Sequence, residues 1–172
     1  YACLVAIMSR GKGYHKVSQQ RLYEATVKNL MPTPIVSSAG ALIDSLHVMG
    51  AKKVSIICPY MKPLTKMVVD YIESEGIEVK DFMALEIQDN LKVAAQDPDA
   101  PAELWKKLDV TGIDVIVASA CVQMPSLSSI ETIEKASGIP TISASVATTY
   151  SILNALKLKP VAPGGGTLLN GH

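Results

Sequence analysis

The sequence is poor in cysteine, in net charge and in long apolar runs, and each shortage excludes a class of protein. Three cysteines in 172 residues do not make a disulfide framework, so we expect reduced thiols. Lys+Arg and Asp+Glu balance at 16 each, which gives a nucleic-acid partner no electrostatic support. No apolar run approaches the roughly 18–20 residues of a membrane span, and no signal peptide precedes the first cysteine. We therefore expect a soluble, cytoplasmic protein that binds neither nucleic acid nor membrane.

Metal and nucleotide motifs are also missing. The three histidines, His15, His47 and His172, share no metal-ligand spacing, and the sequence contains no Cys-x-x-Cys. The segment Gly11-Lys12-Gly13 lacks the spacing of either glycine fingerprint for phosphate or dinucleotide binding, so a flexible lid is the better interpretation. We expect no metal and no cofactor.

What the sequence does contain is a regular alternation of strand and helix patterns, which predicts an α/β fold with parallel sheets. Strands are predicted at residues 35–37, 53–59, 79–85, 113–123 and 141–143. Helices are predicted at residues 14–30, 38–49, 64–75, 102–108, 126–137 and 146–156, with a further one capped by Asp89 or Asn90. Residues 4–8 are interpreted as a strand or a loop, and the glycine-rich segment at residues 163–166 as a flexible tail.

The stretch at residues 113–123 organises the rest of the chain. Its centre, Val115 to Val117, is an unbroken apolar, β-branched run, which is typical of a strand buried on both faces. The stretch ends in small residues and Cys121, shortly before a predicted helix. Ligands of open α/β sheets bind outside the carboxyl ends of the strands. Cys121 therefore lies where chemistry is expected.

An internal repeat places a second cysteine in the same way. Ala2-Cys3 matches Ala120-Cys121, and a proline, a short strand and an apolar helix follow each pair. Residues 35–49 align with residues 142–156 without gaps, Ile35 matching Ile142. Such a repeat indicates two similar α/β halves, each with one cysteine at a strand end.

The repeat also predicts how the chain is divided. A stretch matching residues 53–114 should precede residue 1, so we expect the N-terminal part of the first half to be absent. On this basis residues 1–50 are a remnant of the first half, residues 51–149 are the second half, and residues 150–172 are a C-terminal helix and tail that return to the first half.

The remaining candidates have a structural alternative beside the functional one. A single strand cysteine is most often buried packing, and Cys58, which has no repeat mate, is interpreted in this way. For Cys3 and Cys121 the duplicated placement favours function, and a helix N-terminus would favour the thiolate. Tyr60 and Asn90 fall at strand-to-helix junctions on the same edge, where each could equally anchor a loop or cap a helix.

Taken together, five blocks of sequence resemble the maleate cis-trans isomerase family of the aspartate/glutamate racemase superfamily, to which arylmalonate decarboxylases are related. They are residues 1–8, 38–42, 59–65, 84–91 and 119–124. The resemblance implies two Rossmann-like halves about a pseudo-twofold axis. It also implies cofactor-independent conversion of maleate to fumarate in nicotinate degradation.

The same resemblance implies roles for individual residues. Cys3 corresponds to the nucleophile and Cys121 to its partner, while Tyr60 and Asn90 match residues that contact the substrate. A Ser-Asn motif of the family, which lies in its N-terminal segment, has no match here.

Two carboxylates would have to be bound without Arg or Lys. The expected donors are the backbone N–H groups of Leu4, Val5 and Val122, at helix N-termini or in loops. The expected partner is a small dicarboxylate. The sequence leaves open a homo-oligomer and a separate N-terminal fragment that completes the first half.

Two other functions also stay open. An amino-acid racemase would use the same pair of cysteines, but the residues after each cysteine are mostly apolar, which favours a plain dicarboxylate over an amino acid. A non-catalytic ligand-binding α/β module would bury both cysteines as packing.

Overall fold

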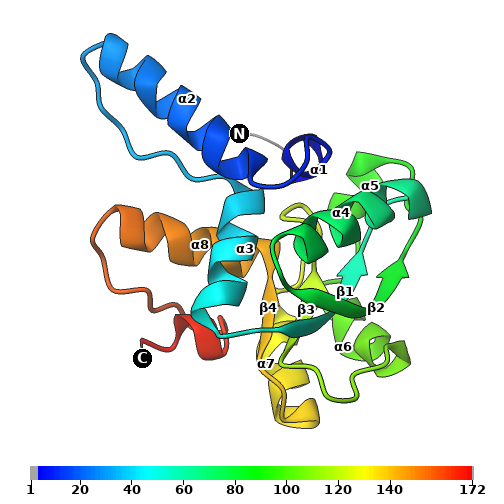
Figure 1. Ribbon diagram of the computed structural model, residues 1–172. Helices are drawn as coiled ribbons and strands as arrows, with labels where there is room; N and C mark the ends of the chain where they lie inside the picture. Colours follow the sequence, from blue (N-terminus) through cyan, green and yellow to red (C-terminus); the bar gives the residue numbers. More distant parts are fainter. Residues whose placement is uncertain (1–3, 172) are drawn as a thin grey trace.

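The computed structural model describes residues 4–171, and their side chains from residue 6 onward. Its centre is one sheet of four parallel strands in the order β2-β1-β3-β4 (Figure 1). The strands are β1 (Lys53–Cys58), β2 (Glu78–Ala84), β3 (Val115–Ser119) and β4 (Thr141–Ser143). The predicted α/β class with a parallel sheet is confirmed.

Helices follow the strands in alternation and pack around the sheet. They are α1 (Leu4–Met8), α2 (Tyr14–Lys28), α3 (Ser38–Val48), α4 (Lys62–Ser74), α5 (Asn90–Ala94), α6 (Ala100–Leu104), α7 (Leu127–Ser137) and α8 (Ala144–Ala155), with short 3₁₀ segments at Trp105–Lys107 and Thr167–Leu169. Within the described part of the chain, no helix is both long and apolar enough to cross a bilayer.

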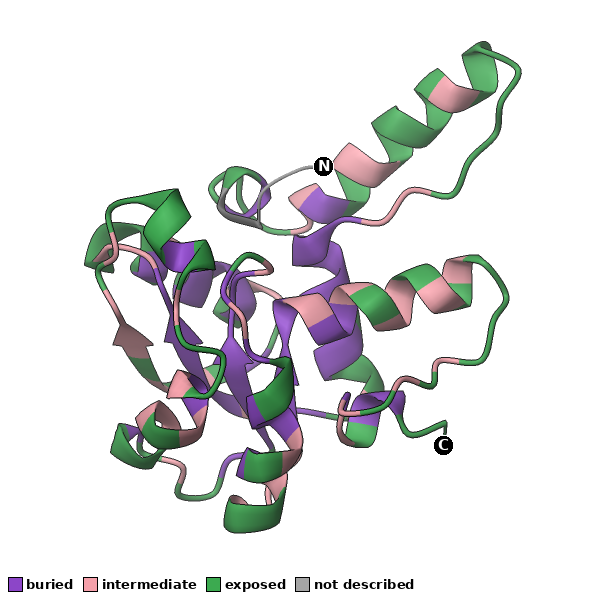
Figure 2. Cartoon of the chain, turned by 180° about the vertical axis from the view of Figure 1, so that it is seen from behind, coloured by how far each residue is buried: buried purple, intermediate pink, exposed green. Residues whose placement is uncertain are grey.

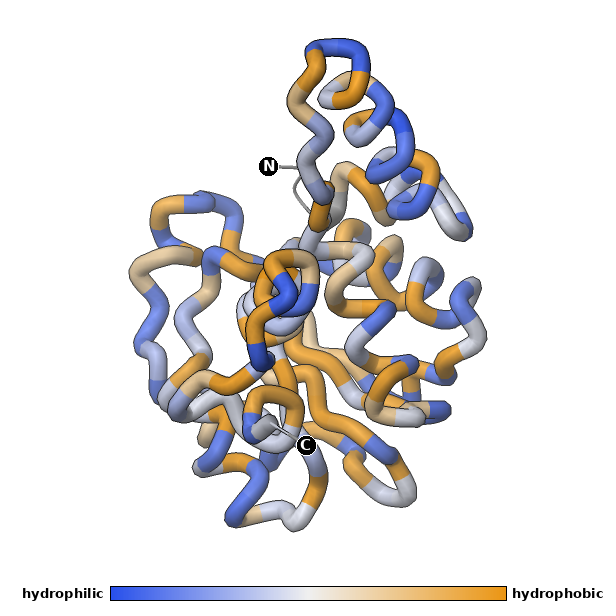
Figure 3. The backbone as a smooth tube through the Cα atoms, turned by 90° about the vertical axis from the view of Figure 1, so that its left-hand side faces the viewer, coloured by the Kyte–Doolittle hydropathy of each residue, from blue (hydrophilic) through white to orange (hydrophobic). Residues whose placement is uncertain are grey.

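The burial of the strands follows their composition. Every residue of β3 is buried, and Ile56 of β1 lies opposite Val117 of β3 at the centre of the sheet. Figure 3 shows the apolar residues concentrated along these strands. Burying one such aliphatic side chain contributes about 1.5–3 kcal/mol. β2 instead alternates exposed and half-buried residues, as expected of a charged edge strand.

The two copies of the repeat meet where α3, from the first copy, packs against α8, from the second. A serine caps each helix: Ser37 Oγ accepts from the Gly40 N–H, and Ser143 Oγ accepts from the Val146 N–H. The two caps are displaced by one residue relative to the gapless alignment, which pairs Ser37 with Ala144. The repeat therefore extends to helix capping, although not in exact register.

Two local predictions were wrong. Residues 4–8 form a helix, because Ile7 and Met8 are buried where α1 packs against α3 and α4, and this packing overrides their strand propensity. Residues 35–37 form no strand and pair with none of the strands of the described sheet. Residues 163–166, as predicted, belong to neither helix nor strand, although Val161 before them bridges to Asn170 and a buried 3₁₀ turn follows them.

Helix α2 stands apart from the rest of the molecule. It projects away from the sheet, and its surface is exposed except at the root (Figures 1 and 2). His15, at that root, is its one buried residue among those described. The N–H and the ring Nδ1 of His15 both contact the hydroxyl of Tyr71, at 3.2 and 2.6 Å. A contact from the Gly13 N–H to the Glu75 carboxylate, at 2.6 Å, also ties the root to α4 and its C-cap.

Candidate active site

The carboxyl ends of β1 and β3 meet at the point where the strand order reverses. The chain leaves β1 toward β2 on one side, and it leaves β3 toward β4 on the other. Ligands of parallel sheets bind at such a switch point. Here the Tyr60 hydroxyl donates to the Ala120 carbonyl at 3.4 Å, so the loop after β1 touches the loop after β3. This contact places Tyr60 beside the residue that precedes Cys121.

The turn that carries Cys121 is fixed by a serine. Ser119 Oγ accepts from the Cys121 N–H at 3.2 Å and donates to the Cys121 carbonyl at 2.9 Å. Cys121 is 3% exposed and packs in an apolar cluster with Ile57 and Met124. Ser119 was not among the predicted site residues, although a serine two residues before the cysteine was a signal that the sequence contained.

The thiol of Cys121 is not at a helix N-terminus, contrary to one expectation. A turn at residues 122–124 follows it, and α7 begins only at Leu127. Val122 is therefore a loop residue, and any anion that it binds would be held by loop backbone and not by a helix end.

Cys58 lies in the core close to Cys121. It is fully buried, and its burial, together with the neighbouring Cys121, raises the pKa of the Cys58 thiol far above its ordinary value. Cys58 therefore stays a neutral thiol at pH 7. This state agrees with the packing role predicted for it.

The loop after β2 is tied to the loop after β1. The Leu85 N–H donates to the Cys58 carbonyl and the Ile87 N–H to the Pro59 carbonyl, each at 2.9 Å. Asn90 follows in this loop as the first residue of α5. The helix cap is Asp89, whose carboxylate accepts from the Leu91 N–H at 2.8 Å. Asn90 is exposed and does not cap the helix, which leaves its amide suited to contact a ligand.

The other predicted residues lie at the start of the chain. Cys3 is outside the described residues. Leu4 and Val5 are the first residues of α1, and the first N–H groups of a helix have no acceptor within it. Helix α1 packs against α4, which begins at Lys62, two residues after Tyr60.

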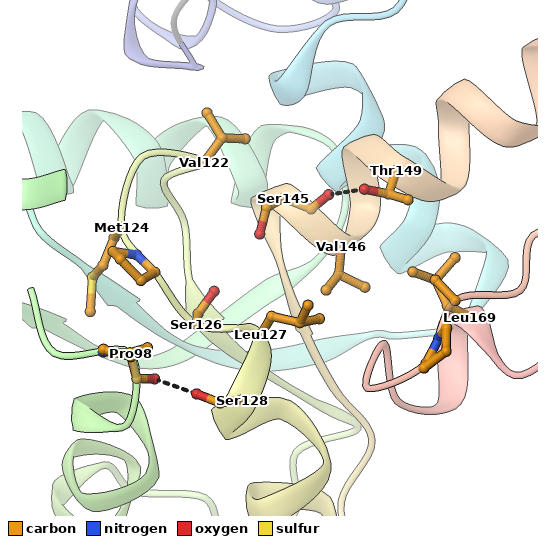
Figure 4. A pocket seen from close by; sticks show the side chains of 13 residues that line it. Pro98, Val122, Met124, Ser126, Leu127, Ser128, Ser145, Val146, Thr149 and Leu169 are labelled. Carbon is orange, nitrogen blue, oxygen red and sulfur yellow. Dashed lines mark hydrogen bonds between the residues drawn. The ribbon is translucent and has the colours of Figure 1, made fainter.

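Val122 lines a cavity that neither Tyr60 nor Cys121 lines. It lines a cavity of about 560 Å³ together with Met124 (Figure 4), whereas Cys121, Tyr60 and Asn90 are not among the lining residues. The structure thus brings Tyr60 and Cys121 together and places Asn90 in the neighbouring loop. Over residues 4–171, no three His, Cys, Asp or Glu side chains lie close enough to hold a metal ion.

Comparison with known sequences agrees with this arrangement. The chain matches the arylmalonate decarboxylase family over residues 3–169. Maleate isomerases from Pseudomonas putida and Geobacillus stearothermophilus are 53% and 52% identical to it over 171 residues. Each alignment covers 99% of this chain and 68% of the relative.

Solved structures give the same result. The maleate isomerase of Pseudomonas putida S16, crystallised with maleate after a cysteine-to-alanine change, is 56% identical, with a TM-score of 0.96 over 99% of this chain and 68% of that one. A cysteine-to-serine variant of the Nocardia farcinica maleate cis-trans isomerase holds a covalently bound succinylcysteine intermediate. It is 40% identical, with a TM-score of 0.96 over 100% of this chain and 70% of that one.

More distant structures share only the fold. An arylmalonate decarboxylase variant is 18% identical, with a TM-score of 0.84. The fold and the site together define the class of protein: a racemase-like α/β fold with a cysteine just beyond the end of a strand. Within that class, the chain belongs to the arylmalonate decarboxylase family. The resemblance to maleate cis-trans isomerases is confirmed.

Proposed function

We propose that this chain isomerises maleate to fumarate by transient addition of a cysteine to the double bond. One observation carries the proposal: Cys121 lies just beyond β3 beside Tyr60, in a chain more than half identical to maleate isomerases. The Nocardia farcinica relative, which holds a succinylcysteine, supports a covalent path.

The chemistry explains why a thiol is needed. Rotation about a carbon–carbon double bond is prohibitive at ambient temperature, so the bond order must be lowered for a time. In the proposed path the Cys3 thiolate adds to one alkene carbon, and the Cys121 thiol gives its proton to the other carbon. The succinyl-thioether then turns about a single bond. Cys121 takes back a proton from the same carbon as the C–S bond breaks, and both cysteines are regenerated.

The two carboxylates would be held by uncharged donors. We assign this role to the backbone N–H groups of Leu4, Val5 and Val122, assisted by the Tyr60 hydroxyl and the Asn90 amide. A hydrogen bond to a charged group contributes about 1.5–3 kcal/mol. The 3.4 Å contact of Tyr60 with the Ala120 carbonyl is long for O–H···O, so this hydrogen bond is a weak one.

No step of this path uses a metal or an organic cofactor, because sulfur supplies the nucleophile and the proton carrier. The resemblance to the family also suggests the setting, a cytoplasmic reaction in nicotinate-type degradation. These finer points belong to the same proposal.

The test is fumarate formation from maleate, followed by absorbance. Cys3→Ser should abolish it, and Cys121→Ala should lower it by roughly 10²–10⁴-fold, the usual range for loss of a general acid–base group. Cys58→Ala is the matched control and should stay active if it folds. Full activity of Cys3→Ala would end the proposal.

Two experiments separate the alternatives. A racemase would exchange the α-proton of L-aspartate in D₂O, whereas we expect no exchange. A non-catalytic module would show slow iodoacetamide labelling of Cys3 and Cys121, and no protection by dicarboxylates.

A further inference from the structure

The cavity of about 560 Å³ lies at the N-terminal ends of α7 and α8, to one side of the candidate active site. It is the size of a small-molecule site. Its walls are mainly apolar, with Leu127, Val146 and Leu169 among them, and four hydroxyl side chains also line it. Figure 4 shows these groups arranged around one space.

Ser126 is the unusual residue of this cavity. It occupies the N-cap position of α7, yet its hydroxyl makes no cap hydrogen bond. Ser37 and Ser143 do cap their helices, as serine normally does at this position. Ser126 is 2% exposed, and its Oγ has no hydrogen-bond partner among residues 4–171. A buried, unpartnered hydroxyl is costly, and one that lines a cavity suggests that a ligand completes it.

The electrostatics of the cavity favour a negatively charged partner. The N-terminus of an eleven-residue helix such as α7 carries partial positive charge and N–H groups without intrahelical acceptors. Neither α7 nor α8 has an acidic residue in its first turn that would repel an anion. No Lys or Arg lines the cavity, so the attraction comes from the helix N-terminus and the hydroxyl alone. One nearby carboxylate, Asp99, is exposed and does not line the cavity, and it accepts from the Ser128 hydroxyl at 2.7 Å.

The apolar walls restrict what the rest of the ligand can be. The second carboxylate of a dicarboxylate such as maleate would lie against the apolar walls and lose hydration, because the hydroxyls of Ser128, Ser145 and Thr149 already have hydrogen-bond partners within the protein. A ligand with one carboxylate and an apolar body satisfies both parts of the cavity.

We propose that this cavity binds an amphipathic monocarboxylate. Its carboxylate accepts from the Ser126 hydroxyl and from the first N–H groups of α7. Its apolar body packs on Leu127, Val146 and Leu169. Because Val122 also lines the cavity, the ligand would lie against the loop that carries Cys121. The inference does not depend on the isomerase proposal, since neither cysteine takes part.

Benzoate is a suitable probe, with benzyl alcohol as its uncharged counterpart. We expect saturable binding of benzoate by calorimetry, and binding at least about tenfold weaker for benzyl alcohol, as for loss of one charge-assisted hydrogen bond. Ser126→Ala should weaken the binding of benzoate by a similar factor. Ser137→Ala, at the other end of α7, is the control and should leave the affinity unchanged.

Amide chemical shifts locate the bound probe independently of the variants. Benzoate should move the signals of residues 122–128 and 145–149, and excess maleate should not displace it. The inference is overturned if benzoate fails to bind, if Ser126→Ala binds it as tightly as the parent chain, or if maleate competes with it. Activity of the cysteine pair plays no part in these outcomes.

Discussion

Tyr60 is the residue whose place in the site is defined most directly by a contact. Its hydroxyl reaches the Ala120 carbonyl, next to Cys121. If it binds a substrate carboxylate, Tyr60→Phe should raise KM by roughly tenfold to a hundredfold, the equivalent of one hydrogen bond to a charged group. Steady-state kinetics with maleate measures this. Tyr23→Phe, on the exposed face of α2, is the control and should change nothing.

His15 supplies a prediction about pH and stability. Burial lowers the pKa of its imidazole below the ordinary 6.5, and the carboxylates of Glu75 and Asp44 oppose this only in part. The unfolded chain therefore binds the proton more readily, so the free energy of unfolding should fall as the pH drops below about 6.5. The contribution of neutral His15 is present in full above that pH.

Urea unfolding at about pH 7.5 and about pH 5.5 measures the effect, since these values bracket the ordinary range of histidine. His15→Gln should lose most of the pH dependence, while His47→Gln, at an exposed position, should keep it. An unchanged pH dependence in His15→Gln would contradict the assignment.

At the scale of single residues, the sequence was informative where backbone position alone decided the matter. It placed Cys121 and Tyr60 at strand ends, and it distinguished Cys58 as packing. It could not identify Ser126, because the local sequence does not reveal whether a serine at an N-cap position makes the cap hydrogen bond. Only the three-dimensional surroundings separate Ser126 from Ser143.

At the scale of helices, the capping serines give a matched pair of variants. Ser143→Ala removes the acceptor of the Val146 N–H and should destabilise the fold by about 1 kcal/mol. Ser126→Ala removes no hydrogen bond among the described residues and should cost little or nothing. Urea titration of both variants checks this. Equal losses of about 1 kcal/mol would show that Ser126 also caps in solution.

The elements themselves were largely predictable, because β1 and β3 are apolar runs and α3 and α4 have clear start and stop residues. The failures have a physical cause. Residues 4–8 and 35–37 are equally apolar, but a strand needs a neighbour to pair with, and the conformation of such short segments is decided by tertiary contacts. The tail folds through Thr167, whose N–H donates to Glu134 of α7, a partner too distant in sequence to foresee.

At the scale of the whole molecule, exposed apolar residues gather on α2 and the turn after it, and on α8. Leu30 is 90% exposed, Met31 70% and Leu156 61%. On the sheet itself, Phe82 of the edge strand β2 is also exposed, at 43%. The division of the chain into two halves stays a prediction. Its parts are a remnant of the first half (residues 1–50), the second half (residues 51–149) and a C-terminal helix and tail (residues 150–172).

This exposure predicts self-association. Large exposed apolar patches on soluble chains mark contact sites or aggregation hazards. Sedimentation velocity over a range of concentrations should show species larger than a monomer. Replacing Leu30 and Met31 by Asn and Gln should shift the distribution toward monomer. At Leu30, whose φ is 57°, asparagine is also the better fit for the left-handed backbone. Purely monomeric behaviour of the parent chain would contradict the prediction.

The central claim is that maleate is bonded to sulfur during turnover and that this sulfur belongs to Cys3. Peptide mass spectrometry of the Cys121→Ser variant, quenched after mixing with maleate, tests it most directly, because a cysteine-to-serine variant of the Nocardia farcinica relative retains a succinylcysteine. We predict a mass increase of one maleic acid on the peptide that contains Cys3, and none on the peptide of Cys58. An unmodified Cys3 in a variant that still binds maleate, or an adduct on Cys58 instead, would contradict the account.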